Sequence, residues 1–457
     1  MPSGLWGRVG GLLMLAVTVA GCAGTGGGGG FEPAGEKYLA VWAGDADRKH
    51  SDFLAIIDAD WSSRSYGKVI RTIPVKSRGN EPHGVNGELR YDRRLFATGL
   101  LTNRVFVFDL RDPAKGTLSY VYEAKGDRTL GAPRNVATLP GGRVAVTCAD
   151  QIGYTGEPRE VLGAPGGLLI LGNDGKFVKE IPAVGPGSRA YVTAPGGVAI
   201  RSQAGILLTT NEAHGFAGTT RGELMPGITV QTWKLPNLTL GRPAVLEAGP
   251  RGEENLGPHT PRIFRGRPFA LVNTHEGGAL YVSDSLQTES PLFKLAFDFG
   301  AGSKPGEAAL TPDDRWYVTA LTGKNQVVSL DVQDPWKPRR VGAVGFGRDP
   351  GAAPDAADAA REGGPHALAM ALDGVRIAVA DYGVDVPTYA LDGDRRVYML
   401  RLDRTTGALR FDGAFRDEVT DEVGVDFDRT SWPHGDTGPA RPRGLLFVAP
   451  GPPEEAD

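Results

Sequence analysis

Cysteine is scarce in this sequence: its 457 residues contain only Cys22 and Cys148. No CxxC pair is present, which excludes a dithiol redox motif and a zinc site built on paired cysteines. Cys148 ends an apolar segment at 144–148, where we expect a buried, unreactive thiol rather than a nucleophile. Because Cys22 lies near the N-terminus, in a separate targeting segment, no internal disulfide is expected in the folded part.

An excess of positive charge is also missing. The chain has 50 Lys and Arg against 54 Asp and Glu, a formal net charge of −4. No basic stripe is present to attract a phosphate backbone, so nucleic acid is not an expected partner. The sequence has neither a Gly-rich phosphate loop after a strand nor a nucleophile elbow, and nucleotide-dependent and hydrolase functions therefore lack support.

The N-terminus carries an apolar run with the features of a targeting signal. Arg8 precedes an apolar stretch at 10–20 that is too short to cross a membrane comfortably as a helix. The stretch ends in V-A-G-C at 19–22, which is similar to a bacterial lipobox, with Cys22 as the residue that receives lipid. An ordinary signal peptide with an incidental cysteine is the alternative.

The predicted organisation follows from this signal. We expect a lipoprotein signal peptide at 1–22, a flexible Gly-rich tether at 23–36, a folded part at 37–450 and a tail at 451–457. The protein would then be exported and anchored to a membrane through Cys22, facing the periplasm or the cell exterior.

Turn-forming residues are abundant, with 66 Gly and 34 Pro, which implies many turns between short strands. One repeat recurs: a polar corner, an apolar strand, a turn such as Asp-Gly, a second apolar strand and two further strands of alternating, half-buried character. Units of four strands that recur at regular intervals along the chain are typical of propeller blades. The predicted blades lie at 82–124, 133–182, 192–246, 258–299, 306–347 and 365–416.

The two ends of the chain complement each other. Residues 38–75 hold three strands without an inner partner, and residues 442–449 form one inner strand with nothing after it. Combined, they make a seventh blade, so we predict an all-β, seven-bladed β-propeller closed by its N- and C-terminal strands. A ring of independent sandwiches is the alternative. Residues 349–364 and 417–440 are interpreted as long surface insertions that flank the sixth blade.

The first strand of each propeller blade lines the central channel, so the residues that open these strands should converge. Three of them are His83, His259 and His366, and three imidazoles suit copper, zinc or iron. The alternative is that each histidine is a corner residue bonded to nearby backbone. The other opening residues are Arg134, Glu307 and Arg443, which are candidate ligand-binding residues, and the third blade contributes Pro195, Gly196 and Gly197. The two arginines would suit an anionic ligand.

Two further polar clusters, NEAH at 211–214 and NTHE at 273–276, follow the second strands of their blades. They are predicted to lie in loops on one face. Carboxylate beside imidazole can serve acid–base chemistry or bind metal, but solvated loop groups are the favoured interpretation.

Several segments, taken in order, carry a resemblance to a known family. They are FLAIIDAD at 53–60, YGKVI at 66–70, EPH at 81–83 with Asn86, NRVFVFD at 103–109, GGLLIL at 166–171, TNE at 210–212, DVQDP at 331–335, GGP at 363–365 and LDG at 372–374. Together they resemble the selenium-binding protein family, which includes methanethiol oxidases. The resemblance implies a seven-bladed propeller and, for the oxidases, copper and the conversion of methanethiol and oxygen into formaldehyde, sulfide and peroxide.

Carried over residue by residue, the resemblance implies metal ligation by His83 and, as a weaker match, by Glu212. This sequence departs from the family pattern, because the paired histidines after Glu81 are reduced to one and the CxxC loop linked to selenium is missing. Selenium binding is therefore not expected. Histidines that the family pattern places near Ala137, Gly205 and Arg443 are also missing.

Two hypotheses of function remain. The first is a methanethiol-oxidase-like enzyme that uses a metal, copper, held by His83, His259, His366 and Glu212. The second is a non-catalytic propeller that binds a protein, a peptide or a small anionic ligand on its loop face or at its axial arginines. A lactonase-like propeller ranks last, because a calcium site would need a ring of Asp, Asn and Glu, and the axial set offers only Glu307.

Overall fold

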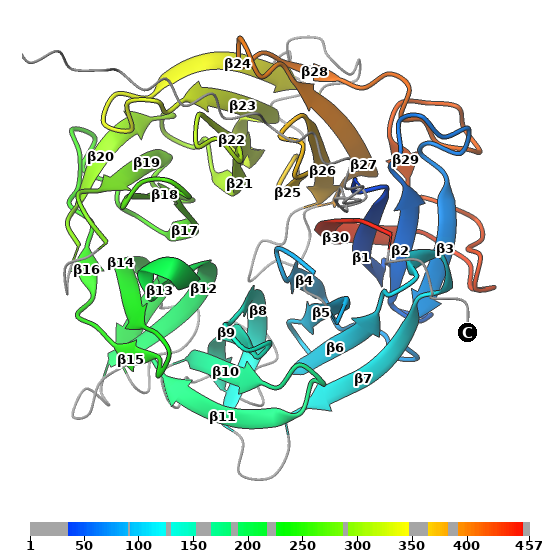
Figure 1. The fold of residues 1–457 in the computed structure, drawn as a ribbon, viewed down its shortest axis with the longest axis horizontal. Coiled ribbons are helices and arrows are strands. Elements are labelled where there is room, and N and C mark those ends of the chain that lie inside the picture. Colours follow the sequence, from blue (N-terminus) through cyan, green and yellow to red (C-terminus); the bar gives the residue numbers. More distant parts are fainter. Residues whose placement is uncertain are drawn as a thin grey trace, which may run out of the picture. The chain divides into compact units, whose positions relative to one another are not determined.

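Seven antiparallel sheets stand around a common axis, which confirms the predicted seven-bladed β-propeller (Figure 1). The computed structural model describes residues 35–89, 92–124, 129–151, 166–183, 191–216, 225–286, 291–346, 364–382 and 392–450. The predicted signal peptide at 1–22 with Cys22, nearly all of the tether at 23–36, the tail at 451–457 and nearly all of the insertion at 349–364 lie outside the described residues.

Each sheet is a blade, and its strands are named from the inner to the outer one. Blade 1 contains β4 (Pro82–Val85), β5 (Arg94–Gly99), β6 (Arg104–Asp109) and β7 (Thr117–Glu123). Blade 2 contains β8 (Leu130–Thr138), β9 (Val144–Gln151), β10 (Gly167–Leu171) and β11 (Phe177–Pro182). Blade 3 contains β12 (Tyr191–Arg201), β13 (Ile206–Phe216), β14 (Met225–Lys234), β15 (Thr239–Leu240) and β16 (Ala244–Val245), which also pairs with β14.

The remaining blades follow the same order. Blade 4 contains β17 (Pro258–Ile263), β18 (Ala270–Thr274), β19 (Ala279–Ser283) and β20 (Phe293–Asp298). Blade 5 contains β21 (Pro305–Leu310), β22 (Trp316–Leu321), β23 (Gln326–Asp331) and β24 (Arg339–Gly345). Blade 6 contains β25 (Ala367–Met370), β26 (Arg376–Tyr382), β27 (Asp392–Leu402) and β28 (Leu409–Phe411), with β29 (Val425–Asp426) paired to β27. Blade 7 contains β30 (Ala440–Val448), β1 (Tyr38–Asp45), β2 (Phe53–Asp58) and β3 (Val69–Pro74).

Blade 7 joins the two ends of the chain, as the sequence predicts. β1 and β30 pair antiparallel from Tyr38 opposite Val448 to Asp45 opposite Ala440. The backbone amide of Lys37 donates a further bond of 3.1 Å to the Val448 carbonyl. This pairing leaves no open sheet edge between the two chain ends, so the ring is closed by hydrogen bonds.

The middle strands are buried on both faces, not half-buried as predicted. Every side chain of β2 is buried, because the sheets of blades 6 and 1 pack on its two sides. Trp42 shows the same packing, since its ring lies 5.2 Å from that of Phe106 in blade 1 and its indole N–H donates to the Thr98 carbonyl at 2.9 Å. Stacking of sheets explains why these strands are nearly continuous apolar runs.

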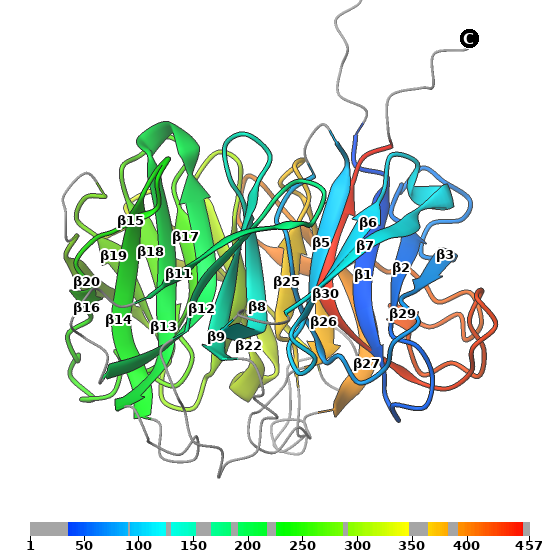
Figure 2. The ribbon, with the colours of Figure 1, turned by 90° about the horizontal axis from the view of Figure 1, so that it is seen from below.

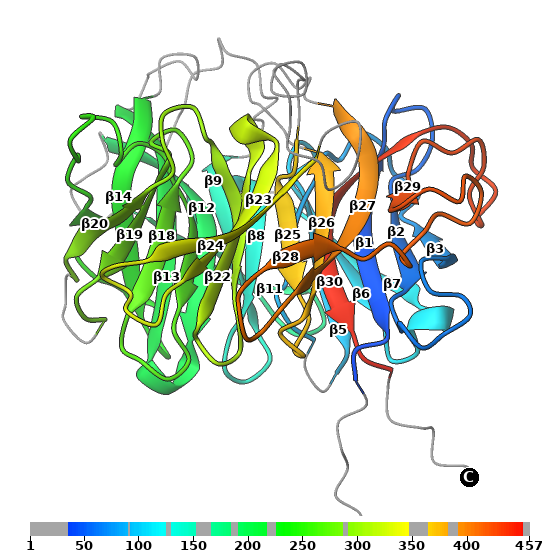
Figure 3. The same cartoon turned by 90° about the horizontal axis from the view of Figure 1, so that it is seen from above.

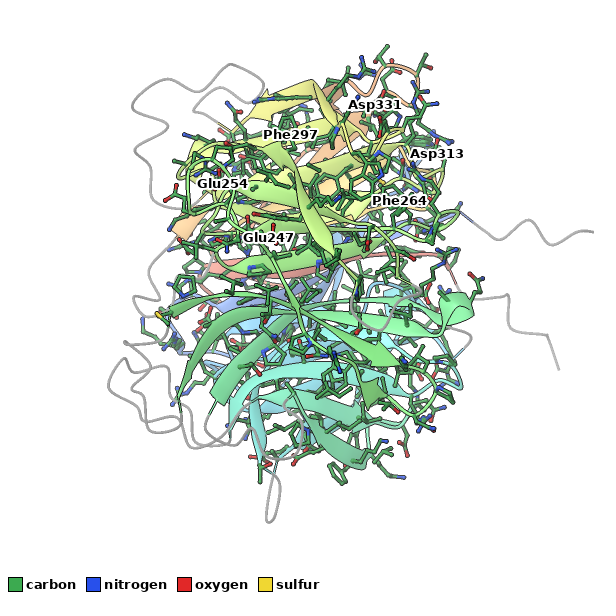
Figure 4. All side chains as sticks on the ribbon, turned by 90° about the vertical axis from the view of Figure 1, so that its left-hand side faces the viewer. Glu247, Glu254, Phe264, Phe297, Asp313 and Asp331 are labelled. Carbon is green, nitrogen blue, oxygen red and sulfur yellow. The ribbon has the colours of Figure 1, made fainter. Side chains whose placement is uncertain are left out.

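The blade order assigns every turn to one of two faces. The turns between first and second strands and between third and fourth strands share one face with the start of β1 and the end of β30, which we call the termini face (Figures 2 and 3). The opposite face, which we call the site face, holds the starts of the inner strands. Figure 4 shows Phe264 and Asp313, from first turns of blades 4 and 5, toward one face and Glu254, which precedes β17, toward the other.

The predicted surface insertion at 417–440 differs from the expectation, because part of it is core. It contributes β29 and buries Phe427 and Trp432, whose rings lie 5.2 Å apart. Phe53 of blade 7 packs on Trp432 at 4.6 Å, so the segment fills the space between blades 6 and 7. Burial of one such ring contributes on the order of 2–3 kcal/mol. The acidic residues that dominate this segment of the sequence conceal its apolar set.

No helix among the described residues is long and apolar enough to cross a membrane. Cys148 is 1% exposed, as predicted, and burial raises the pKa of its thiol.

Candidate functional site

A proline and the residue after it occupy equivalent positions in every blade, within or just before the inner strand. The pairs are Pro82-His83, Pro133-Arg134, Pro195-Gly196, Pro258-His259, Pro305-Gly306, Pro365-His366 and Pro442-Arg443. In six blades the strand register shifts at this pair, which marks a β-bulge. A bulge releases backbone groups from the ladder and re-aims one side chain, and proline is tolerated there because it has no N–H to pair. The repeated bulge therefore turns the second residue of each pair toward the axis.

In blades 1 to 4, a polar side chain of the second strand holds the released backbone and links it to the next blade. Thr98 accepts the Gly84 amide at 2.9 Å and donates to the Arg134 carbonyl at 2.6 Å. Thr147 donates to the Gly196 carbonyl at 2.6 Å, Thr210 to the His259 carbonyl at 2.8 Å, and the Asn273 amide to the Gly306 carbonyl at 2.8 Å. Site residues of one blade are thus positioned by the preceding blade.

Three imidazole rings meet at the site face. The ring centroids of His259 and His366, two of the predicted metal-site residues, lie 5.5 Å apart. His275 completes the group, at 5.4 Å from His259 and 5.8 Å from His366. The sequence predicts His275, which follows β18, to be a solvated loop residue. The turn after a second strand lies on the same face as the start of an inner strand, and this topological signal points to His275.

The hydrogen bonds of His366 fix which ring nitrogen carries its proton. Thr322 donates its single hydroxyl hydrogen to the Pro365 carbonyl at 2.8 Å. Its oxygen also lies 3.2 Å from Nδ1 of His366, so Nδ1 must be the donor in that contact. Nε2 of the neutral ring then carries a lone pair.

The same reasoning applies to the other two rings. Nδ1 of His275 lies 3.0 Å from the Pro305 carbonyl, which can only accept. Nδ1 of His259 lies 2.9 Å from the Thr260 hydroxyl, which donates to the Gly306 carbonyl at 3.3 Å. Each of these three histidines is therefore hydrogen-bonded to a neighbouring group, as in the alternative interpretation, but the bond uses only Nδ1 of the ring. In neutral rings it leaves three Nε2 lone pairs in one cluster.

Burial and nearby arginines keep the axial histidines uncharged. Burial is the main cause that lowers the pKa of His366 well below its usual value, and the positive charge of Arg443 lowers it further. Burial also dominates for His83 and His259, with Arg443 and Arg134 adding to the decrease in pKa. Protonation of these rings is therefore disfavoured at neutral pH, and their nitrogens stay available as electron-pair donors.

Glu212 reaches the axis through the gap that Gly196 leaves. A Cβ atom on Gly196 would lie 2.0 Å from the Glu212 carboxylate, so only glycine allows this approach. The carboxylate pairs with the Arg134 guanidinium and lies 3.8 Å from Nε2 of His259. The expected metal residue Glu212 and the expected anion-binding residue Arg134 therefore face each other, and their charges largely cancel. Glu212 lies within β13 and not in a loop.

Glu307 occupies a different position from the other axial residues. Gly306, not Glu307, follows the proline in blade 5, so Glu307 is one residue beyond the equivalent position. Successive strand residues point to opposite faces of a sheet. The Glu307 carboxylate accepts the Leu368 amide at 3.3 Å and thereby links blade 5 to blade 6.

Imidazole nitrogens and a carboxylate are suitable donors for a metal ion, but these side chains do not form a complete coordination sphere. Among the described residues, no three His, Cys, Asp or Glu side chains are arranged so that they could hold a metal ion. His83 is 8% exposed, and its buried Nδ1 has no hydrogen-bond partner in the described part of the chain. Arg443 is 3% exposed and lies in β30. Of the first predicted polar cluster, at 211–214, the side chain of His214 lies outside the described residues.

Comparison with curated proteins finds two partial matches. A methanethiol oxidase from a Hyphomicrobium species is 34% identical over 153 residues, which cover 32% of this chain and 32% of that protein. Selenium-binding protein 1 from Arabidopsis thaliana is 30% identical over 122 residues, 24% of this chain and 25% of that protein. The matched segments thus span about a third or less of these relatives' lengths. No protein-family model matches the chain.

Solved structures match over nearly the whole chain. A hypothetical selenium-binding protein from Sulfolobus tokodaii has a TM-score of 0.69 at 16% identity, covering 93% of this chain and 96% of its own. A periplasmic gluconolactonase from Pseudomonas aeruginosa has a TM-score of 0.59 at 14% identity, covering 91% and 99%. At such identities the likeness shows the propeller fold alone.

Proposed function

Because the chain is a divergent relative of the selenium-binding proteins, we propose that it is a metal-dependent oxidoreductase acting on a small thiol, with an activity like that of the methanethiol oxidases. The observation that carries this proposal is the group of three imidazoles at the axis, His259, His275 and His366. Each is anchored through Nδ1, so that Nε2 carries the lone pair of the neutral ring. Anchoring of the second nitrogen is the usual arrangement of metal-binding histidines.

The ring spacing supports the same assignment. Metal–nitrogen bonds of about 2.0–2.1 Å place the centroids of three imidazoles that share one metal roughly 5–5.5 Å apart. The observed spacings are 5.4, 5.5 and 5.8 Å. The proposal therefore requires a small turn of these rings toward one another. His83 and Glu212, the latter 3.8 Å from Nε2 of His259, are the remaining candidate ligands.

Copper bound there would supply one-electron redox chemistry and an open position for oxygen. The chain's own groups would bind and orient the thiol. The positive charge of Arg443 favours the thiolate form of a substrate at the axis, because an opposite charge nearby stabilises an ionised group. In the overall reaction, methanethiol, oxygen and water give formaldehyde, sulfide and hydrogen peroxide. The carbon loses two electrons and oxygen gains them.

Metal content and thiol consumption test the proposal together. Purified full-length protein is incubated with copper or zinc, dialysed and subjected to elemental analysis, and methanethiol loss and peroxide formation are then measured. We expect about one metal per chain, as for a single three-histidine centre, and a sharp loss in His366→Ala. His50→Ala, which removes a partly exposed histidine away from the axis, is the control and should behave as wild type. Wild-type protein that retains no metal and consumes no thiol would refute the proposal.

A non-catalytic propeller that binds a small anion is the second candidate. It is favoured by Arg443 and Arg134, whose charges lower the pKa values of the axial histidines and so act within the channel. Metal-free protein that binds an anion such as sulfate, with loss of binding in Arg443→Gln, would support this function over the first.

We also propose that the protein is exported and held on a membrane by lipid on Cys22. The support is the sequence alone: the apolar stretch at 10–20, the V-A-G-C motif at 19–22 and the glycines that follow. Mass spectrometry of the N-terminal peptide tests this assignment directly.

A further inference from the structure

Large apolar side chains are exposed on the termini face. Four of the nine such side chains among the described residues lie in its turns: Trp61 is 49% exposed, Leu292 63%, Trp336 36% and Leu372 65%. Trp61, Leu292 and Trp336 come from turns between third and fourth strands of blades 7, 4 and 5, and Leu372 from the first turn of blade 6. A soluble surface exposes single apolar residues routinely, but these four share one face of the ring.

Each of the two tryptophan rings, Trp61 and Trp336, has a cationic side chain close to it. The guanidinium groups of Arg376 and Arg401 lie 5.4 and 5.0 Å from the Trp61 ring centroid. The ammonium of Lys294 lies 5.9 Å from the Trp336 ring. A ring with a wet edge and a neighbouring cation suits the boundary between lipid headgroups and acyl chains, where tryptophan is enriched.

The chain enters the propeller on this same face. Glu36 accepts the amide of Leu372 at 2.6 Å, and Lys37 forms an ion pair of 3.0 Å with Asp60, next to Trp61. The first described residues therefore run beside two of the four apolar side chains. Gly35 follows Cys22 by 13 residues in the sequence, a distance that even a fully extended chain limits to roughly 45 Å. A lipid on Cys22 would hold the termini face close to the membrane.

We propose that the termini face rests on a phospholipid bilayer through Trp61, Leu292, Trp336 and Leu372, so that the imidazole cluster faces away from the membrane. This inference rests on the proposed lipid anchor. The short tether keeps the four side chains at high local concentration near the surface, so weak individual contacts suffice. The site face, at the other end of the inner strands, stays open to substrate.

Quenching of tryptophan fluorescence tests the contact. Full-length lipidated protein is reconstituted in vesicles of phosphatidylethanolamine and phosphatidylglycerol, with or without bromine atoms near the headgroup end of the acyl chains. We expect brominated lipid to quench emission of the wild type, with partial loss of quenching in Trp61→Phe and in Trp336→Phe. The double variant should lose it, because the other four tryptophans among the described residues are buried.

Met225→Ser is the matched control, because Met225 is also exposed, at 56%, but begins β14 on the site face. It should leave the quenching unchanged. Mass spectrometry of the same samples reports the lipid on Cys22 separately. A lipidated wild type that is quenched no more than the double variant overturns the docking face and leaves the anchor intact. Absence of lipid on Cys22 overturns the anchor and this inference with it.

Discussion

Replacing Thr322 by valine tests whether the anchored nitrogen of His366 matters for metal binding. The hydroxyl accepts Nδ1–H of His366 at 3.2 Å and donates to the Pro365 carbonyl at 2.8 Å, and valine can do neither. The ring would lose the group that selects its tautomer. We therefore expect weaker binding of the proposed metal, although Thr322 itself is not a proposed ligand.

A comparison of the losses in metal affinity and in folding stability distinguishes a positioning role of Thr322 from a structural one. Loss of two buried hydrogen bonds costs roughly 2 kcal/mol of the free energy of unfolding. Removal of a group that orients a metal-binding histidine typically lowers metal affinity about 10- to 100-fold, which corresponds to roughly 1.4–2.8 kcal/mol of binding free energy. Thr311→Val is the matched control, because its buried hydroxyl accepts the Trp316 amide at 2.9 Å and donates to Asp313 at 2.6 Å, both away from the axis. It should lose stability but keep its metal affinity.

Two assays follow from this design. Competition titration with a chelator measures copper affinity in the wild type and both variants, and urea unfolding measures stability. Nitrogen-15 spectra of the metal-free wild type should show protonated Nδ1 on His259, His275 and His366. Equal copper affinity in Thr322→Val and wild type, or protonated Nε2 in the spectra of the wild type, would contradict the tautomer argument.

Three further outcomes are expected. Burial raises the pKa of Asp52 from 3.8 to about 6. Its contribution to the free energy of unfolding is therefore greatest below pH 4 and falls by about 3 kcal/mol as the pH rises through 6. Urea unfolding of the wild type and of Asp52→Asn between pH 4 and 7 should show this difference, and parallel stability curves would contradict it. Gly196→Ala forces the Glu212 carboxylate aside and should cost roughly 1–3 kcal/mol by the same method, whereas Gly413→Ala, with open space around it, should be nearly neutral. Cys148, 1% exposed, should resist iodoacetamide in the folded protein, and rapid labelling of its peptide under native conditions would disprove that burial.

Local patterns were sufficient to predict the blades. Turn residues and apolar strands recur within each unit, so four-stranded sheets can be recognised without knowledge of distant contacts. The closing blade was predictable because 38–75 and 442–449 lacked partners in their own neighbourhoods. The burial of Phe427 and Trp432 was not, since their partners lie in another blade and acidic residues surround them in sequence.

The site was predictable only in part, because side-chain direction depends on register. His259 and His366 follow prolines and were found by that pattern, whereas Glu307 is displaced by one position and accepts the Leu368 amide of blade 6. His275 required knowing which turns share a face. The pairing of Arg134 with Glu212 joins two blades, so no local signal in the sequence could reveal it.

The closure of blade 7 sets the order in which the protein can be completed. Arg443 belongs to β30, and β1 cannot find its inner partner until that strand has been synthesised. A nascent chain that ends before residue 440 therefore holds β1, β2 and β3 without their final neighbour, and its channel lacks one wall. Closure of the ring must therefore wait until the last strand has been synthesised. It should occur in a single final step rather than advance with chain length.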